Sequence, residues 1–75
     1  MTKRHTEKDT YMVVTYTDDD KVSVKVFNDS NLNYTNVTKF AEATHDNNPN
    51  VLTTSIAVME NGSPREFVRY VKEVI

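Results

Sequence analysis

The sequence contains no cysteine, a single glycine, and two histidines that lie far apart, His5 and His45. Without cysteine the chain can form neither a disulfide nor a zinc–thiolate site. One glycine cannot build the glycine-rich loop that cradles a phosphate. No Gly-x-Ser-x-Gly elbow is present to activate a serine. These absences predict a protein that is not an enzyme and that has no catalytic residues, metal site or cofactor of its own.

Long apolar runs and a strong charge of one sign are also missing. No segment approaches the roughly 18 apolar residues of a membrane span, and none follows the basic N-terminus as in a secretory signal. This pattern predicts a cytoplasmic protein. Eleven acidic against nine basic residues give a net charge of −2, which provides no strong attraction to nucleic acid or membranes. A chain of 75 residues is one domain with a thin core.

Three segments have the composition of strands. Residues Thr10–Thr17 are dense in β-branched and aromatic side chains, and Lys21–Phe27 alternates apolar and polar residues. The three aspartates at 18–20 separate the two segments, and they favour a turn, so we expect a hairpin. The segment Val51–Glu60 predicts the third strand.

Two segments have helical features. The first, from about Thr35 to Thr44, carries a modest apolar stripe. The second, from Ser63 to about Val74, begins with Ser63, Pro64 and Glu66, which match a capping box with proline at the first helical position. Its apolar residues recur at helical spacing: Phe67, Val68, Val71, Val74 and Ile75. We therefore expect the element order β-β-α-β-α.

This order predicts an α+β fold, a two-layer sandwich in which a three-stranded sheet has both helices on one face. We expect strand order 2-1-3, with the third strand antiparallel to the first; order 1-2-3 is the alternative. Residues 1–9 are expected to form a flexible polar tail, and residues 10–75 the single domain. The expected core consists of Met12, Val14, Tyr16, Val22, Val24, Val26, Phe40, Ala41, Leu52, Ile56, Val58, Phe67, Val68, Val71 and Val74. Tyr11 and Val13 are nearly as apolar as their neighbours, and a one-residue slip would exchange the two faces.

The other face of such a sheet has no element left to cover it. It would carry Tyr11, Val13, Lys25 and Phe27, which we take as the candidate partner-binding residues. The two free edges of the sheet favour association as well. The predicted function is a small protein-binding module whose partner is another protein or a second copy of itself, as a homodimer. The abundance of Asn and Thr suggests an accessory protein of a phage or mobile element that modulates or inhibits a host protein.

Two other functions remain as alternatives. Lys25, Arg65, Arg69 and Lys72, with the basic tail, could bind nucleic acid, because three of these cations recur along one flank of the second predicted helix. A less favoured alternative is an enzyme subunit that completes a site only in an oligomer. No feature of the sequence indicates a membrane-associated function.

Overall fold

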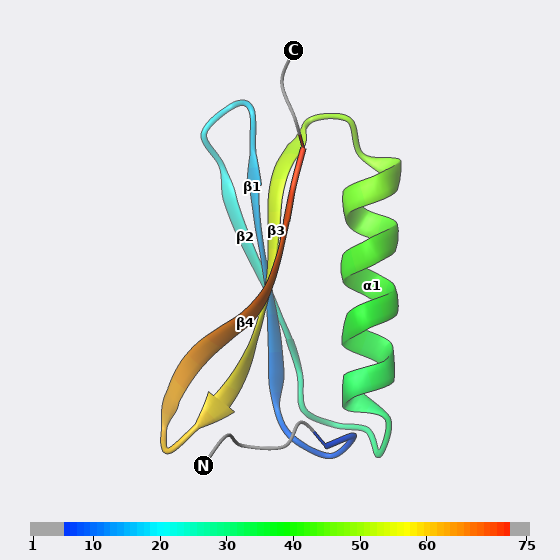
Figure 1. Cartoon of the computed structure of the whole chain (residues 1–75), viewed down its shortest axis with the longest axis vertical. Helices are drawn as coiled ribbons and strands as arrows, with labels where there is room; N and C mark the ends of the chain where they lie inside the picture. The colour runs from blue at the N-terminus through cyan, green and yellow to red at the C-terminus, as the bar shows by residue number, and fades with distance from the viewer. Residues whose placement is uncertain (1–5, 73–75) are drawn as a thin grey trace.

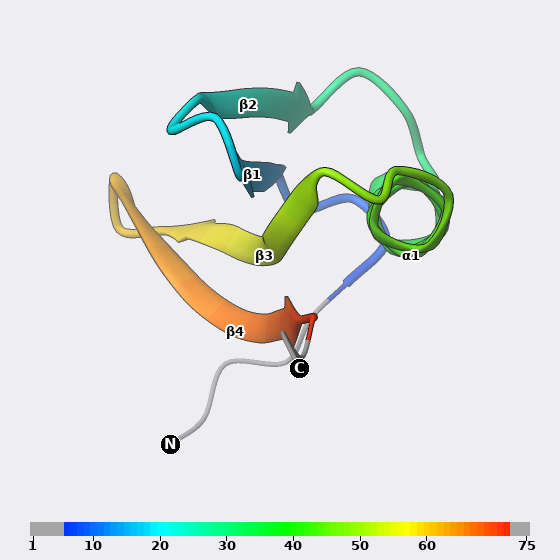
Figure 2. The ribbon, with the colours of Figure 1, turned by 90° about the horizontal axis from the view of Figure 1, so that it is seen from above.

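The structure is a computed structural model that describes residues 6–72. Its elements, in chain order, are β1 (Tyr11–Thr17), β2 (Val22–Phe27), α1 (Asn33–Asn47), β3 (Val51–Glu60) and β4 (Ser63–Val71) (Figure 1). The four strands form one antiparallel sheet in the order β2-β1-β3-β4. Helix α1 lies against one face of this sheet, and no other described element covers the opposite face (Figure 2). The fold is α+β.

The second predicted helix is wrong, because Ser63–Val71 forms strand β4. The two residues before it, Asn61 and Gly62, have φ angles of 53° and 82°. Positive φ at both central residues is what a two-residue hairpin turn of type I′ requires. The chain therefore reverses at this point, and Ser63 pairs with Glu60. The Ser-Pro-Arg-Glu sequence resembles a capping box but starts a strand.

The sheet consequently has four strands rather than three, and one helix covers it rather than two. The first three strands are ordered β2-β1-β3, with β3 antiparallel to β1, as we expected for the smaller sheet. The added hairpin places β4 on the far side of β3. The predicted helix positions Val74 and Ile75 lie outside the described residues.

Helix α1 begins at Asn33, earlier than the expected start near Thr35, and the residue before it makes no side-chain cap. Instead, a residue of the predicted tail accepts hydrogen bonds from the N-terminal backbone N–H groups of the helix. The Glu7 carbonyl accepts a hydrogen bond from the backbone of Asn33 at 2.7 Å, and the Glu7 carboxylate accepts one from the backbone N–H of Thr35 at 2.8 Å. A carboxylate at this end of a helix also interacts favourably with the helix dipole. Residues 6–9 thus fix the start of α1 against β1.

The hydrogen bonds that the side chain and backbone of Thr35 donate hold the pKa of Glu7 below its usual value near 4.5. A lowered folded-state pKa adds stability above the unfolded-state pKa, and this is lost as the pH falls through the folded value. We expect Glu7→Gln to lower the urea midpoint at pH 7 and to have a clearly smaller effect at pH 3. Chemical denaturation of both proteins at the two pH values measures this. An equal midpoint difference at pH 7 and pH 3 would contradict the capping role of the carboxylate.

The core lies between α1 and the sheet face that it covers. Its fully buried apolar residues come from β1, α1 and β3: Tyr11, Val13, Val37, Ala41, Ile56 and Val58. Partly buried rings extend it, because Tyr11 contacts the rings of Tyr34 and Phe67 edge-on at centroid distances of 5.5 and 6.0 Å. Phe27 and Phe40 pack together at 5.5 Å beside them.

The expected core is reversed on β1 and β2. Tyr11 and Val13, expected on the free face, are 0% and 1% exposed, whereas Val24, expected in the core, is 55% exposed. The pairing register explains the exchange. Tyr11 is opposite Val58 and Val13 is opposite Ile56, and residues directly opposite each other project to the same face. Once Ile56 and Val58 face the helix, Tyr11 and Val13 must do so too. Of the expected core residues in β4, Val71 is 61% exposed.

His45, near the C-terminal end of α1, is buried and connects the helix to the sheet. Its Nδ1 lies 3.1 Å from the hydroxyl of Thr54 on β3, and its ring lies 5.7 Å from that of Tyr70 on β4. No buried side-chain nitrogen or oxygen in residues 6–72 lacks a hydrogen-bond partner. The histidine therefore has a satisfied structural role at the helix end.

Candidate docking surface

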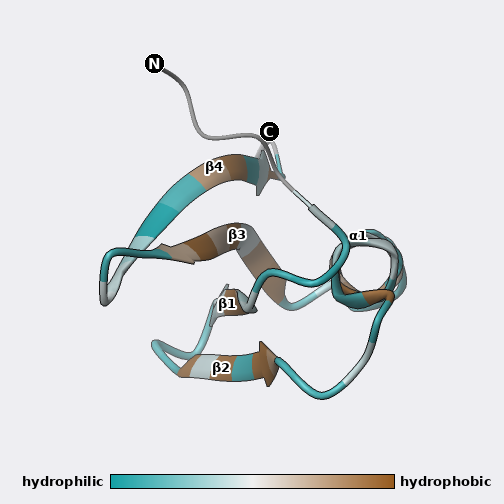
Figure 3. Cartoon of the chain, turned by 90° about the horizontal axis from the view of Figure 1, so that it is seen from below, coloured by the Kyte–Doolittle hydropathy of each residue, from teal (hydrophilic) through white to brown (hydrophobic). Residues whose placement is uncertain are grey.

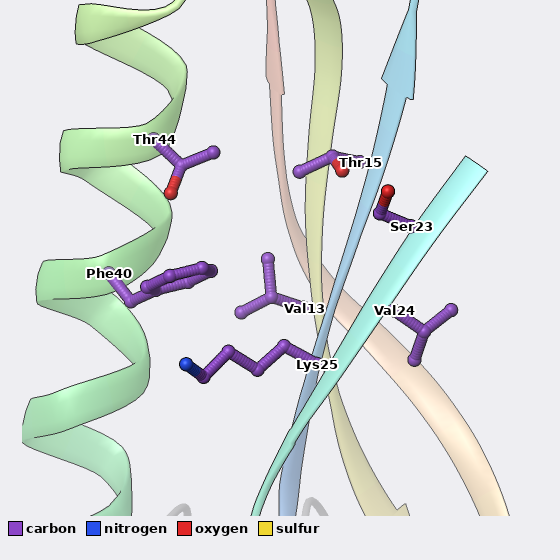
Figure 4. Close-up of a pocket in the computed structure, with 7 residues that line it drawn as sticks. All are labelled: Val13, Thr15, Ser23, Val24, Lys25, Phe40 and Thr44. Carbon is purple, nitrogen blue, oxygen red and sulfur yellow. The ribbon is translucent and has the colours of Figure 1, made fainter. Parts of the chain in front are cut away.

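The sheet face turned away from α1, hereafter the open face, is apolar along the two strands of the first hairpin. Val22, Val24 and Val26 of β2 are 63%, 55% and 49% exposed. Met12 and Val14 of β1 lie directly opposite Val26 and Val24 and share their face. We call the set Met12, Val14, Val22, Val24 and Val26 the valine patch. Figure 4 shows the side chain of Val24 directed away from the helix, and Figure 3 shows the apolar segments of β2.

The other half of the open face is polar. Arg69 of β4 lies opposite Ser55 of β3, and it donates hydrogen bonds to both carboxylate oxygens of Glu66 at 3.1 Å. Hydrogen bonds from Ser55 and Arg69 lower the pKa of the Glu66 carboxyl. The first half of β4 is correspondingly hydrophilic (Figure 3). The open face therefore has an exposed apolar half and a polar half, and in the polar half the charges of Arg69 and Glu66 neutralise each other.

The four predicted partner-binding residues lie on the covered face. Tyr11 and Val13 are buried in the core, and the ring of Phe27 packs against Phe40 of α1. The ammonium group of Lys25 lies 4.8 Å from the centroid of the Phe40 ring. The four residues are neighbours, as predicted, but they lie on the sheet face that α1 covers. The exposed apolar residues of the first hairpin include Val22, Val24 and Val26 of the valine patch, which we had expected in the core.

The four cations of the nucleic-acid alternative are not gathered on one surface. Lys25 lies on β2 and Arg65 and Arg69 on β4, which are the opposite edges of the sheet. Arg65 pairs with Glu60 at 3.4 Å, Arg69 pairs with Glu66, and Lys72 donates to the carbonyl of Asn48. Arg65 and Arg69 lie on β4 and Lys72 directly follows it, so the three cations do not form the row expected on a helix flank.

A groove runs between α1 and the first hairpin, on the covered face. Its volume is about 230 Å³, and it is lined by Val13, Thr15, Ser23, Val24, Lys25, Phe40 and Thr44 (Figure 4). Pockets that hold drug-sized ligands measure roughly 300–1000 Å³. The groove exists because α1 covers β1 and β3 more fully than β2. It is too small to make a ligand site a better candidate than the open face.

Comparisons with known proteins identify no relative. No protein-family model, curated protein or solved structure matches the chain. Within residues 6–72, no three His, Cys, Asp or Glu side chains gather where they could hold a metal ion. The one described helix is not long and apolar enough to cross a membrane. The candidate site therefore depends on the geometry of the open face.

The sequence did contain a signal for the valine patch. Val22, Val24 and Val26 alternate with Ser23 and Lys25, so these three valines must share one face. What the alternation does not reveal is whether that face meets the helix. The register of β1 with β3 decides this, because it places Val13 opposite Ile56 in a ladder that runs without a shift from Tyr11 to Tyr16.

Proposed function

We propose that this chain is a small non-enzymatic protein-binding module whose docking surface is the valine patch. The observation that carries this proposal is the exposure of three valines in one row on β2, at 63%, 55% and 49%. Contiguous exposed apolar surface is uncommon on small monomeric proteins, and it marks sites of association. The flanking Arg69–Glu66 pair supplies a polar rim like that of typical interfaces.

The proposed role of modulating another protein rests on the composition of the chain. A protein that docks through the apolar part of a sheet face acts by occupying its partner's surface, which is the simplest mode of modulation or inhibition. The Asn- and Thr-rich sequence supports an accessory protein of a phage or mobile element with a bacterial host protein as its partner.

A pull-down with matched variants tests the docking surface. Val14→Lys places a charge in the centre of the patch at a half-exposed position, where the lysine can extend to solvent. Val71→Lys adds the same charge to the open face outside the patch. We expect wild type and Val71→Lys to recover one stoichiometric protein from a bacterial lysate, and Val14→Lys to lose it by at least tenfold. Far-UV circular dichroism confirms that both variants are folded.

Equal recovery by both variants would contradict docking on the valine patch. The nucleic-acid alternative gives a different result in a second assay. A mobility shift of labelled single- or double-stranded nucleic acid that weakens with salt would support it. We expect no shift at low salt, since three of the four cations proposed for that role are held by acceptors of the chain itself.

A further inference from the structure

The two edges of the sheet differ in how they are protected. The β4 edge has a register shift opposite Ile56 and Ala57, contains Pro64, and carries charged side chains at Arg65 and Glu66. Bulges, prolines and charges are the usual means by which proteins prevent further strand pairing. The β2 edge pairs with β1 without a shift, has no proline, and carries one charged side chain, Lys25, whose ammonium group lies over the Phe40 ring of α1. No described element lies beyond this edge (Figure 2). It is an open template for another strand.

The backbone groups available at the β2 edge follow from the register. The backbone N–H of Thr17 donates to the carbonyl of Lys21 at 3.0 Å, and hydrogen-bonded pairs alternate along an antiparallel ladder. The odd-numbered residues of β2 therefore bond to β1. The N–H and C=O groups of Val22, Val24 and Val26 point away from β1, toward solvent. The residues whose side chains form the exposed row are thus also those whose backbone groups are free to pair.

Charge selects one register for a second copy of β2. When Val24 pairs with Val24 of the second copy, Val22 is opposite Val26 and Ser23 is opposite Lys25. A shift of two residues one way places Lys25 opposite its own copy, and a shift the other way places Lys21 opposite Lys25. Like charges directly opposite each other destabilise a sheet. The register centred on Val24 uses all the free valine backbone groups and has no lysine facing a lysine.

From this geometry we infer that two copies of the chain pair antiparallel through β2, centred on Val24, to form one continuous eight-stranded sheet. The pairing is isologous, as in most homodimers. Both helices lie on the same face, and they are separated because each helix lies mainly over β1 and β3 of its own sheet and reaches β2 through Phe40. The two valine patches join on the opposite face into one larger apolar surface. The dimer uses the edge of the sheet and needs no other partner, so it can be tested apart from the proposed function.

Single cysteine variants test the dimer, because the natural chain has no cysteine. In the inferred register the two Cα atoms of residue 24 are about 5.5 Å apart, within disulfide range. We expect Val24→Cys to form a disulfide-linked dimer under mild oxidation. Val22→Cys and Val26→Cys should not crosslink alone, since each lies about 14 Å from its own copy. An equimolar mixture of these two variants should crosslink as a heterodimer.

Val71→Cys is the matched control, since Val71 is an equally exposed valine at the opposite edge (61%) and can crosslink only by collision. We expect Val24→Cys to oxidise at least tenfold faster than this control. Light scattering of the wild type at about 100 µM should give twice the chain mass of 8.6 kDa, and Val24→Lys should return it to that of one chain. Equal rates for the two cysteine variants, faster crosslinking of Ser23→Cys or Lys25→Cys, or a monomeric wild type would each overturn the inference.

Discussion

Val13→Asp is expected to unfold the protein. Val13 is 1% exposed in the core between β1 and α1, and the side chain opposite it on β2, Lys25, has its ammonium group over the Phe40 ring. The substitution removes a buried apolar side chain and places a carboxyl group among the apolar side chains of the core. Such changes cost about 4–5 kcal/mol or more, which is comparable to the whole stability of many small domains. Far-UV circular dichroism at 25 °C should show loss of the folded signal.

The neighbouring position supplies the control for this experiment. Val24→Asp is the same substitution on β2, at a side chain that is 55% exposed on the open face. It should stay folded and change the free energy of unfolding by less than about 1 kcal/mol. The sequence predicted the reverse arrangement, with Val24 in the core and Val13 on the uncovered face. If Val24→Asp unfolds the chain and Val13→Asp does not, Val24 lies in the core and Val13 on the open face, which would contradict the arrangement described above.

Tyr11→Ala has the second largest expected effect. The ring is fully buried and contacts the rings of Tyr34 and Phe67, and its hydroxyl donates to the carbonyl of Thr6 at 2.6 Å. Removing a buried aromatic ring costs about 3–5 kcal/mol through lost burial and a residual cavity. In a core this thin, urea denaturation should show a midpoint shift of about 2 M or complete unfolding. A shift corresponding to less than about 1 kcal/mol would place Tyr11 outside the core.

Tyr11→Phe separates the ring from the hydroxyl. It keeps the aromatic contacts and should cost about 1 kcal/mol, the usual contribution of one hydrogen bond. Burial raises the pKa of Tyr11 to about 12, so its contribution is present below pH 10 and is lost as the pH rises through 12. The stability difference between wild type and Tyr11→Phe should therefore shrink between pH 10 and pH 12. A constant difference over that range would contradict a buried, hydrogen-bonded hydroxyl.

Local sequence patterns predicted the first three strands well. Thr10–Thr17, Lys21–Phe27 and Val51–Glu60 differ from the observed bounds by at most one residue, because β-branched residues and flanking turn residues act locally. The sequence predicted the helix but placed its start too late, because the helix is capped by Glu7, 28 residues before Thr35. A cap that is distant in the chain has no local signature.

The segment after Glu60 shows how two local signals can conflict. Ser63, Pro64 and Glu66 have the spacing of a helix start, whereas Asn61-Gly62 has the composition of a hairpin turn. The hairpin prevails because the new strand gains a full ladder with β3 and buries Phe67, Val68 and Tyr70 against the core. An isolated helix of similar length would gain only its own internal hydrogen bonds.

The candidate site shows what patterns alone leave undetermined. By itself, the sequence determined that Val22, Val24 and Val26 share a face and that Tyr11 and Val13 share another, because side chains alternate along a strand. Only the tertiary structure decided which face is covered. One helix can cover only one side, and the register that places Ile56 opposite Val13 puts the aromatic side under it, where the larger rings bury more area. The valine row is left exposed for that reason.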